Sequence, residues 1–122
     1  ILEDATVPRS RIAEMVERIQ EIARRHGLTI GTFGHAGDGN LHPTIVLDPA
    51  DTAAMERAHA AVDEIFAEAI AMDGSITGEH GVGLVKLRHL EAQLGADHLA
   101  LLRRIKAAFD PNGILNPGKL GS

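Results

Sequence analysis

The sequence predicts an α+β fold in which helices pack on one face of a small antiparallel sheet and further helices follow at the C-terminal end. Two observations support this fold class. Apolar residues recur at helical spacing over two long segments, and two short β-branched segments lie between them, separated by a glycine-rich loop. The chain has 122 residues, 44% of them hydrophobic and 24% charged, which suits one globular domain or part of a larger one.

The first predicted helix lies between Pro8, which suits a first turn, and Gly27, which ends the periodic pattern. Its apolar positions recur every three or four residues: Ile12, Met15, Val16, Ile19, Ile22 and Ala23.

Residues 28–33 and 41–47 are the two predicted strands, and the second contains Pro43. Because proline has no N–H to donate to a neighbouring strand, we expect the second strand to lie at a sheet edge or to be irregular near its start. Two strands alone make a marginal sheet. We therefore expect further strands, or a partner that supplies them.

A second long helix is predicted over residues 50–72, with Gly74 as its stop. Its apolar stripe consists of Met55, Ala58, Val62, Ile65, Phe66 and Ala69. Further along, four leucines at positions 84, 87, 90 and 94 predict a shorter helix that ends at Gly95. Asp97 can then cap a last helix that reaches Phe109, and turn-forming residues follow it.

Composition excludes several functions. Twelve basic and seventeen acidic residues give a net charge of −5, no run of lysine or arginine forms a stripe, and aromatic residues make up 2%. Nucleic acid and anionic membrane surfaces are therefore not expected partners. Cysteine is absent, so any metal must be held by histidine and carboxylate groups. Without a secretion signal or a long apolar run, we expect a cytoplasmic protein, and a chain that begins at Ile1 is expected to be part of a longer one.

Eight of the thirteen glycines fall in two windows, residues 31–39 and 74–83, and these windows contain or adjoin a group of titratable side chains. His35 and His42 bracket the first loop, where a hairpin would bring them close to one another. Glu79 and His80 lie in the second window. Adjacent side chains of an extended segment point to opposite faces, but Gly78 and Gly81 can relax that restriction by admitting backbone conformations closed to other residues.

These residues allow three interpretations. A glutamate oxygen with two imidazole nitrogens is a common ligand set for a divalent metal, which would leave His80 as a general base. A metal-dependent hydrolase would use the same His-His-Glu site, with His80 activating water. In a non-catalytic interaction module, the glycines would only form turns. The other histidines, His26, His59, His89 and His98, are interpreted as surface or structural residues.

Three segments resemble a known family: Gly34-His-Ala-Gly-Asp-Gly-Asn-Leu-His-Pro43, Gly74-Ser-Ile-Thr-Gly-Glu-His-Gly-Val-Gly83 and Ala108-Phe-Asp-Pro-Asn-Gly-Ile-Leu-Asn-Pro-Gly-Lys119. They are similar to the C-terminal part of FAD-linked 2-hydroxy acid dehydrogenases, which include the glycolate oxidase D-subunit and the D-lactate and D-2-hydroxyglutarate dehydrogenases. The resemblance covers nearly the whole chain, including Val7-Pro-Arg-Ser10.

The resemblance implies a fold and a domain organisation. Residues 1–109 would be the C-terminal half of a ferredoxin-like cap domain, and residues 110–122 a tail returning to an FAD-binding domain that this chain lacks. FAD would be bound mainly by that other domain of the parent chain, so the fragment alone is not expected to turn over. Further oxidase subunits are expected partners, and the fragment could form a homodimer through its sheet edges.

The resemblance also implies site roles. His35, His42 and Glu79 would bind a divalent metal such as zinc or manganese, His80 would be the catalytic base, and Asn116 would lie near the flavin. Hydroxyglutarate-type relatives carry a substrate-binding asparagine two positions after the second histidine, where this chain has Thr44. A small 2-hydroxy acid is therefore the expected substrate.

Overall fold

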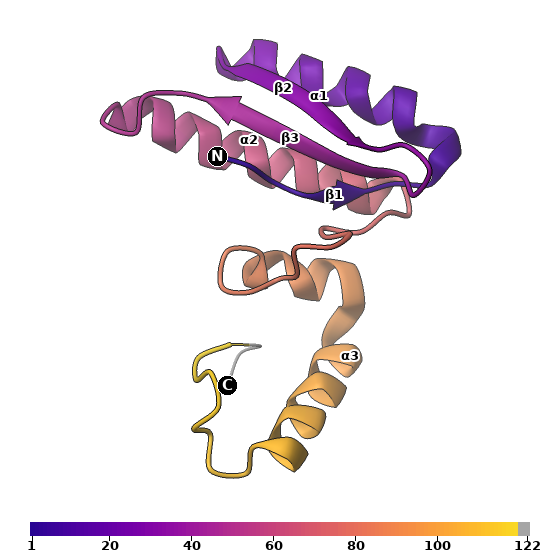
Figure 1. Ribbon diagram of the computed structural model, residues 1–122, viewed down its shortest axis with the longest axis vertical. Helices are drawn as coiled ribbons and strands as arrows, with labels where there is room; N and C mark the ends of the chain where they lie inside the picture. Colours follow the sequence, from indigo (N-terminus) through magenta and orange to yellow (C-terminus); the bar gives the residue numbers. More distant parts are fainter. Residues whose placement is uncertain (120–122) are drawn as a thin grey trace. The chain divides into compact units, whose positions relative to one another are not determined.

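The computed structural model describes residues 1–119 and separates the chain into two compact units, Ile1–His80 and Gly81–Ser122. The predicted α+β class is confirmed, since the first unit combines a small antiparallel sheet with two long helices (Figure 1). Its elements in chain order are β1 (Ala5–Thr6), a 3₁₀ turn (Arg9–Arg11), α1 (Ile12–His26), β2 (Thr29–His35), β3 (Asn40–Val46) and α2 (Thr52–Ala71). The second unit contains α3 (Leu87–Phe109).

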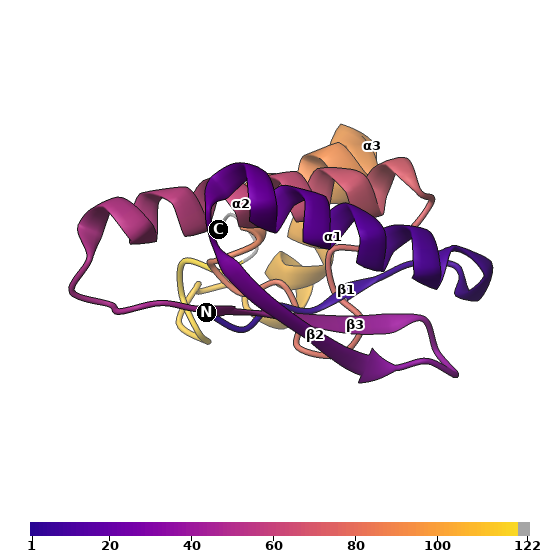
Figure 2. The ribbon, with the colours of Figure 1, turned by 90° about the horizontal axis from the view of Figure 1, so that it is seen from above.

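The sheet of the first unit has the strand order β1-β3-β2, and both strand pairs are antiparallel. Helices α1 and α2 lie side by side on one face of this sheet (Figure 2). Alternate residues of β3 point to this face, and the buried apolar core there includes Met15, Ile19, Ile22, Leu41, Ile45, Ile65 and Phe66. No helix of the first unit covers the opposite face, which carries His42 and the half-exposed Phe33.

The expectation that Pro43 marks an edge strand is wrong, because β3 is the central strand. The carbonyl of Pro43 accepts a hydrogen bond of 3.0 Å from the N–H of Glu3. In an antiparallel strand the N and O atoms of one residue face the same neighbour. The missing N–H therefore faces the irregular N-terminal segment and not β2, so the ladder between β2 and β3 loses no hydrogen bond.

The third strand, β1, was missed because its two residues show no alternating pattern. It pairs with β3 through Ala5 opposite Leu41 and Thr6 opposite Asn40. On its other side, Thr6 and Ser75 exchange backbone hydrogen bonds of 2.8 and 2.7 Å. The expected additional strand thus comes from the chain itself. Within residues 1–119, the outer edge of β2 has no strand partner, and its pairing with a second copy stays a prediction.

Most helix boundaries follow the sequence signals. Gly27 ends α1 in the left-handed conformation with φ of 61°, whereas Pro8 precedes the 3₁₀ turn and not α1 itself. The two helices expected on either side of Gly95 form one element, α3, which is interrupted at that glycine by a non-helical φ of 78° and ψ of 164°. Among the described residues, no helix combines the length and the apolar character needed to cross a membrane.

Candidate metal centre

The first glycine-rich segment forms the predicted hairpin between β2 and β3. The turn is closed by the carbonyl of His35, which accepts hydrogen bonds from the N–H groups of Asp38 at 2.9 Å and Gly39 at 3.1 Å. Gly39 has a φ of 77°, which a residue with a side chain rarely adopts. The turn therefore fixes the register that determines which face His35 and His42 occupy.

Both histidines lie on the face of the sheet that the helices leave open. His35 pairs with Asn40 across the hairpin and Phe33 pairs with His42, so the two histidines are diagonal neighbours on one face. Their ring centroids are 5.4 Å apart, in an edge-to-face arrangement. His42 is 4% exposed, and its side chain packs beside Phe33 at a centroid distance of 5.3 Å. His35 is exposed, which leaves one side of the pair open to solvent.

The second glycine-rich segment brings Glu79 to these histidines. Its Oε1 atom lies 3.0 Å from Nε2 of His42 and 3.5 Å from Nε2 of His35. One candidate ligand atom from each of the three residues lies within 4.8 Å of the other two. Side chains that are far apart in the sequence therefore converge on one point, and their role as metal ligands stays a prediction.

His80 lies at the same place. Its ring stacks on that of His42 with centroids 5.1 Å apart and an interplanar angle of 21°, and its Nε2 is 3.9 Å from Oε1 of Glu79. The two adjacent side chains thus reach one centre. Gly81 has the expected left-handed φ of 80°, but Gly78 does not adopt a left-handed φ. What requires glycine there is space, because a Cβ would lie 2.4 Å from Oγ1 of Thr6.

The geometry suits a divalent metal. Two ligand atoms that each lie about 2.1 Å from a tetrahedral ion are about 3.4 Å apart, and the distances of Glu79 Oε1 to the two imidazole nitrogens are close to that value. Two imidazoles and one carboxylate match the donors preferred by zinc and manganese. Nδ1 of His42 is buried without a hydrogen-bond partner, so the polar contacts of this ring are concentrated at Nε2.

Comparison with known proteins identifies the family. The sequence model of the family described as FAD linked oxidases, C-terminal domain, matches residues 1–120. The chain belongs to this family. The predicted resemblance is thereby confirmed, and the family match favours the flavoprotein interpretation over a metal-dependent hydrolase.

Several individual proteins are similar in sequence to this FAD-linked oxidase domain. The chain is 55% identical over 120 residues to the glycolate oxidase subunit GlcD of Bacillus subtilis, which covers 98% of the chain and 26% of that protein. It is 40% identical over 120 residues to a mitochondrial D-lactate dehydrogenase (cytochrome) of Arabidopsis thaliana, covering 98% of the chain and 21% of the relative. Identity to GlcD of Escherichia coli is 38% over 116 residues, covering 95% and 23%. The chain thus spans about a quarter of the length of these relatives.

The loop that carries the glutamate of this oxidase domain is held by Asp4, a residue that the sequence reasoning did not single out. Its carboxylate accepts hydrogen bonds from the Thr77 hydroxyl and from the N–H groups of Gly78, Glu79 and His80. Burial would raise the pKa of Asp4, but these hydrogen bonds lower the pKa well below its usual range. No local pattern could reveal this role, since the partners lie more than seventy positions away.

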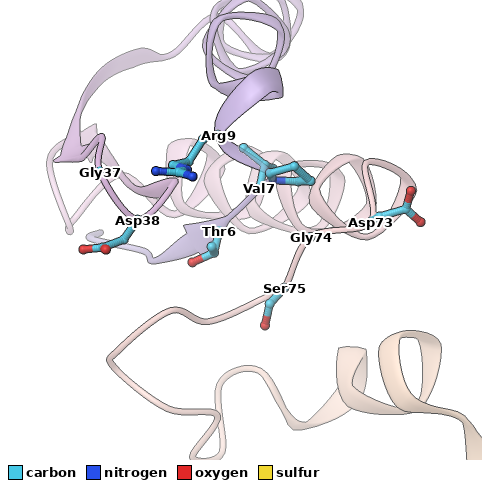
Figure 3. Close-up of a pocket in the computed structure, with 9 residues that line it drawn as sticks. Thr6, Val7, Arg9, Gly37, Asp38, Asp73, Gly74 and Ser75 are labelled. Carbon is cyan, nitrogen blue, oxygen red and sulfur yellow. The ribbon is translucent and has the colours of Figure 1, made fainter.

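A shallow cavity of about 450 Å³ lies next to this loop in the first unit (Figure 3). The side chain of Arg9 points toward the hairpin turn at Asp38, and Asp73 lies at the other end of the cavity. None of the four predicted site residues of the first unit lines it. Because its charges are of both signs and it is separate from the histidine cluster, we assign no substrate to it.

The predicted flavin residue and a histidine predicted to be structural lie apart from the cluster in the sequence. Asn116 belongs to the second unit, where it has a left-handed φ of 47°, and its role near the flavin stays a prediction. His26 is structural, as expected, because its Nε2 lies 2.7 Å from Oε1 of Glu64 between α1 and α2. Hydrogen bonds from His26 and Arg25 lower the pKa of Glu64 below its usual value.

Proposed function

We propose that this chain forms the metal-binding wall of the substrate site in an FAD-dependent 2-hydroxy acid dehydrogenase. The supporting observation is the convergence of His35, His42 and Glu79 in a domain of the FAD-linked oxidase family. The names of the relatives refer to glycolate and D-lactate, which are both small 2-hydroxy acids. A small 2-hydroxy acid is therefore the substrate class that we propose for the complete protein.

The three ligands would hold a divalent metal through their imidazole nitrogens and carboxylate oxygen. When bound, the metal would supply a Lewis acid that orients a 2-hydroxy acid and makes its hydroxyl group more acidic. The side of the cluster at His35 and Glu79 is solvent-accessible, since these side chains are 58% and 49% exposed. A small acid would approach from this side, whereas buried His42 serves as the fixed ligand at the back of the site.

We assign His80 as the base that takes the proton of the substrate hydroxyl group. Its ring is stacked on His42, its Nε2 lies 3.9 Å from Oε1 of Glu79, and 42% of its side chain is exposed. Oxidation also removes the C2 hydrogen with its two electrons, and FAD, held mainly by another domain of the parent chain, would supply the acceptor for them. Asn116 is the residue of this chain that would help to hold the flavin. His80 thereby receives one proton for each acid oxidised to its 2-oxo product.

The proposal is tested on the complete protein by measuring flavin content, metal affinity and turnover of glycolate and D-lactate with a dye acceptor. We expect His35→Ala and Glu79→Gln to weaken binding of Mn²⁺ and Zn²⁺ by tenfold or more, since each removes a ligand. We expect His80→Gln to reduce turnover by a factor of about 10² to 10⁴ while flavin content and metal affinity are retained.

His59→Ala is the matched control, because this histidine is exposed on α2 and lies outside the cluster. It should leave all three measurements unchanged. A colourless protein without flavin would contradict the dehydrogenase proposal, and metal affinity unchanged in both ligand variants would contradict the metal site. An equal loss of turnover, flavin and metal in His80→Gln would show that His80 is structural. The cytoplasmic location and the further oxidase subunits stay predictions.

A further inference from the structure

Asp4 is a buried carboxylate beneath the segment that carries Glu79 and His80. It is 0% exposed. The N–H groups of Gly78, Glu79 and His80 donate to it at 2.9, 3.1 and 2.9 Å, and the Thr77 hydroxyl donates at 2.6 Å. Three consecutive N–H groups that point to one carboxylate fix the path of the backbone at each of these residues. The direction in which Glu79 and His80 project therefore depends on this one side chain.

A second contact fixes how close the segment lies to the hairpin. A Cβ at Gly78 would be 2.4 Å from Oγ1 of Thr6 and 2.6 Å from Cγ of Asn40. These two side chains are within 3.3 Å of each other through their oxygen atoms, and Asn40 lies opposite His35 in the hairpin. Asp4 therefore orients a segment that is packed directly against the strands carrying the two histidines.

We propose that Asp4 is a positioning residue that holds Glu79 and His80 toward His35 and His42. This inference rests on the proposed metal site. The hydrogen bonds that the Asp4 oxygens accept come from the Thr77 hydroxyl and the three backbone N–H groups. Asp4 acts on metal binding only through the geometry of the segment.

The decisive change is Asp4→Asn, which keeps the shape of the side chain. One oxygen is replaced by an NH₂ group, which at either position would face the N–H of Gly78 and cannot accept its hydrogen bond. The segment would lose part of its anchoring while all four residues of the cluster are retained. Removing groups that orient metal ligands typically lowers metal affinity by about 10- to 100-fold, and we expect a loss in this range.

Asp51→Asn is the matched control. The Asp51 carboxylate also accepts a backbone hydrogen bond, of 2.9 Å from the N–H of Ala54, but it caps the start of α2. The complete protein and both variants are titrated with Mn²⁺ and, separately, with Zn²⁺, and thermal unfolding is measured without metal. We expect Asp4→Asn to weaken binding of both ions at least tenfold, whereas Asp51→Asn keeps the affinity of the unmodified protein even if it melts earlier.

Other outcomes would overturn the inference in distinguishable ways. If the unmodified protein binds both ions and Asp4→Asn binds them equally well, Asp4 does not position the ligands, although the metal site stands. If Asp51→Asn weakens binding as much as Asp4→Asn, the loss reflects stability and not positioning. If the unmodified protein binds neither ion, the metal site and the inference fall together.

Thr77→Val provides a second variant should Asp4→Asn fail to fold. It removes the 2.6 Å hydrogen bond from the Thr77 hydroxyl to Asp4 and nearly preserves side-chain volume. One hydrogen bond is worth a factor of about 2 to 10 in a folding equilibrium, and we expect a decrease in metal affinity that does not exceed this range. An affinity equal to that of the unmodified protein would contradict the inference.

Discussion

Replacing Gly78 by alanine tests whether the glutamate-bearing segment must lie this close to the hairpin. The added Cβ would be 2.4 Å from Oγ1 of Thr6 and 2.6 and 2.7 Å from Cγ and Oδ1 of Asn40. Real Cβ atoms essentially never lie closer than 3.0 Å to such neighbours. The segment or the two side chains must therefore move by about half an ångström or more. Because Gly78 does not have a left-handed φ, this steric conflict is the main effect.

The size of the effect follows from that displacement. Overpacking of a tight site costs typically about 1–3 kcal/mol of stability. Metal sites tolerate deviations of only about 0.2 Å in their ligand distances, so a shift of Glu79 by half an ångström should weaken metal binding by about tenfold or more. The assay is titration of the complete protein with Mn²⁺, together with thermal unfolding in the absence of metal.

Gly37→Ala is the matched control, because a Cβ at this turn position would have no atom within 4 Å and no left-handed φ is required. It should retain the metal affinity of the unmodified protein. Combining Gly78→Ala with Thr6→Ala and Asn40→Ala removes the obstructing atoms and should restore part of the lost affinity. If Gly78→Ala alone binds Mn²⁺ as tightly as the unmodified protein, the close approach of the segment does not determine the position of Glu79.

Two further predictions concern stability and pH. Phe66→Ala should cost about 3–5 kcal/mol in urea denaturation because it empties the core, whereas Phe33→Ala, on the open face at 59% exposure, should cost much less. The pKa of Asp110 is lowered chiefly by Lys106, so its stabilising effect is complete above the ordinary aspartate pKa and is lost as pH falls through the lower folded value. An NMR titration of the folded protein should show that the pKa of Asp110 is lowered. Lys106→Met should raise that pKa. An unchanged pKa in that variant would contradict the assignment.

The sequence predicted the fold where its signals are local. The apolar stripes of α1 and α2 and the glycine turn of the hairpin depend on nearby residues, and all three elements formed as expected. The predictions were wrong or incomplete where contacts between distant segments determine the structure. β1 exists because its two residues complete the pairing of β3, and Pro43 is tolerated in a central strand because its nitrogen faces the N-terminal segment. Neither relationship can be read from neighbouring residues.

The same distinction applies to the candidate site. Glycine clusters and residue chemistry indicated the four residues of the cluster, because hairpins bring their own ends together and Gly81 provides a left-handed turn. Asp4 and the close packing of Gly78 escaped notice, since both depend on contacts between segments that lie far apart in the sequence. The candidate ligands could thus be proposed from their own chemistry, whereas the contacts that orient them required the tertiary structure.

The separation of the candidate ligands along the chain has a thermodynamic consequence. His42 and Glu79 are separated by the 36 residues 43–78, which include all of α2, so an ion bound by both would act as a reversible cross-link across the first unit. Such an ion stabilises only the folded state, by about 2.7 kcal/mol when its concentration is a hundred times the Kd. A chelating buffer would then lower the melting temperature of the protein as well as its metal content, and metal supply in the cell would influence how long the folded enzyme persists.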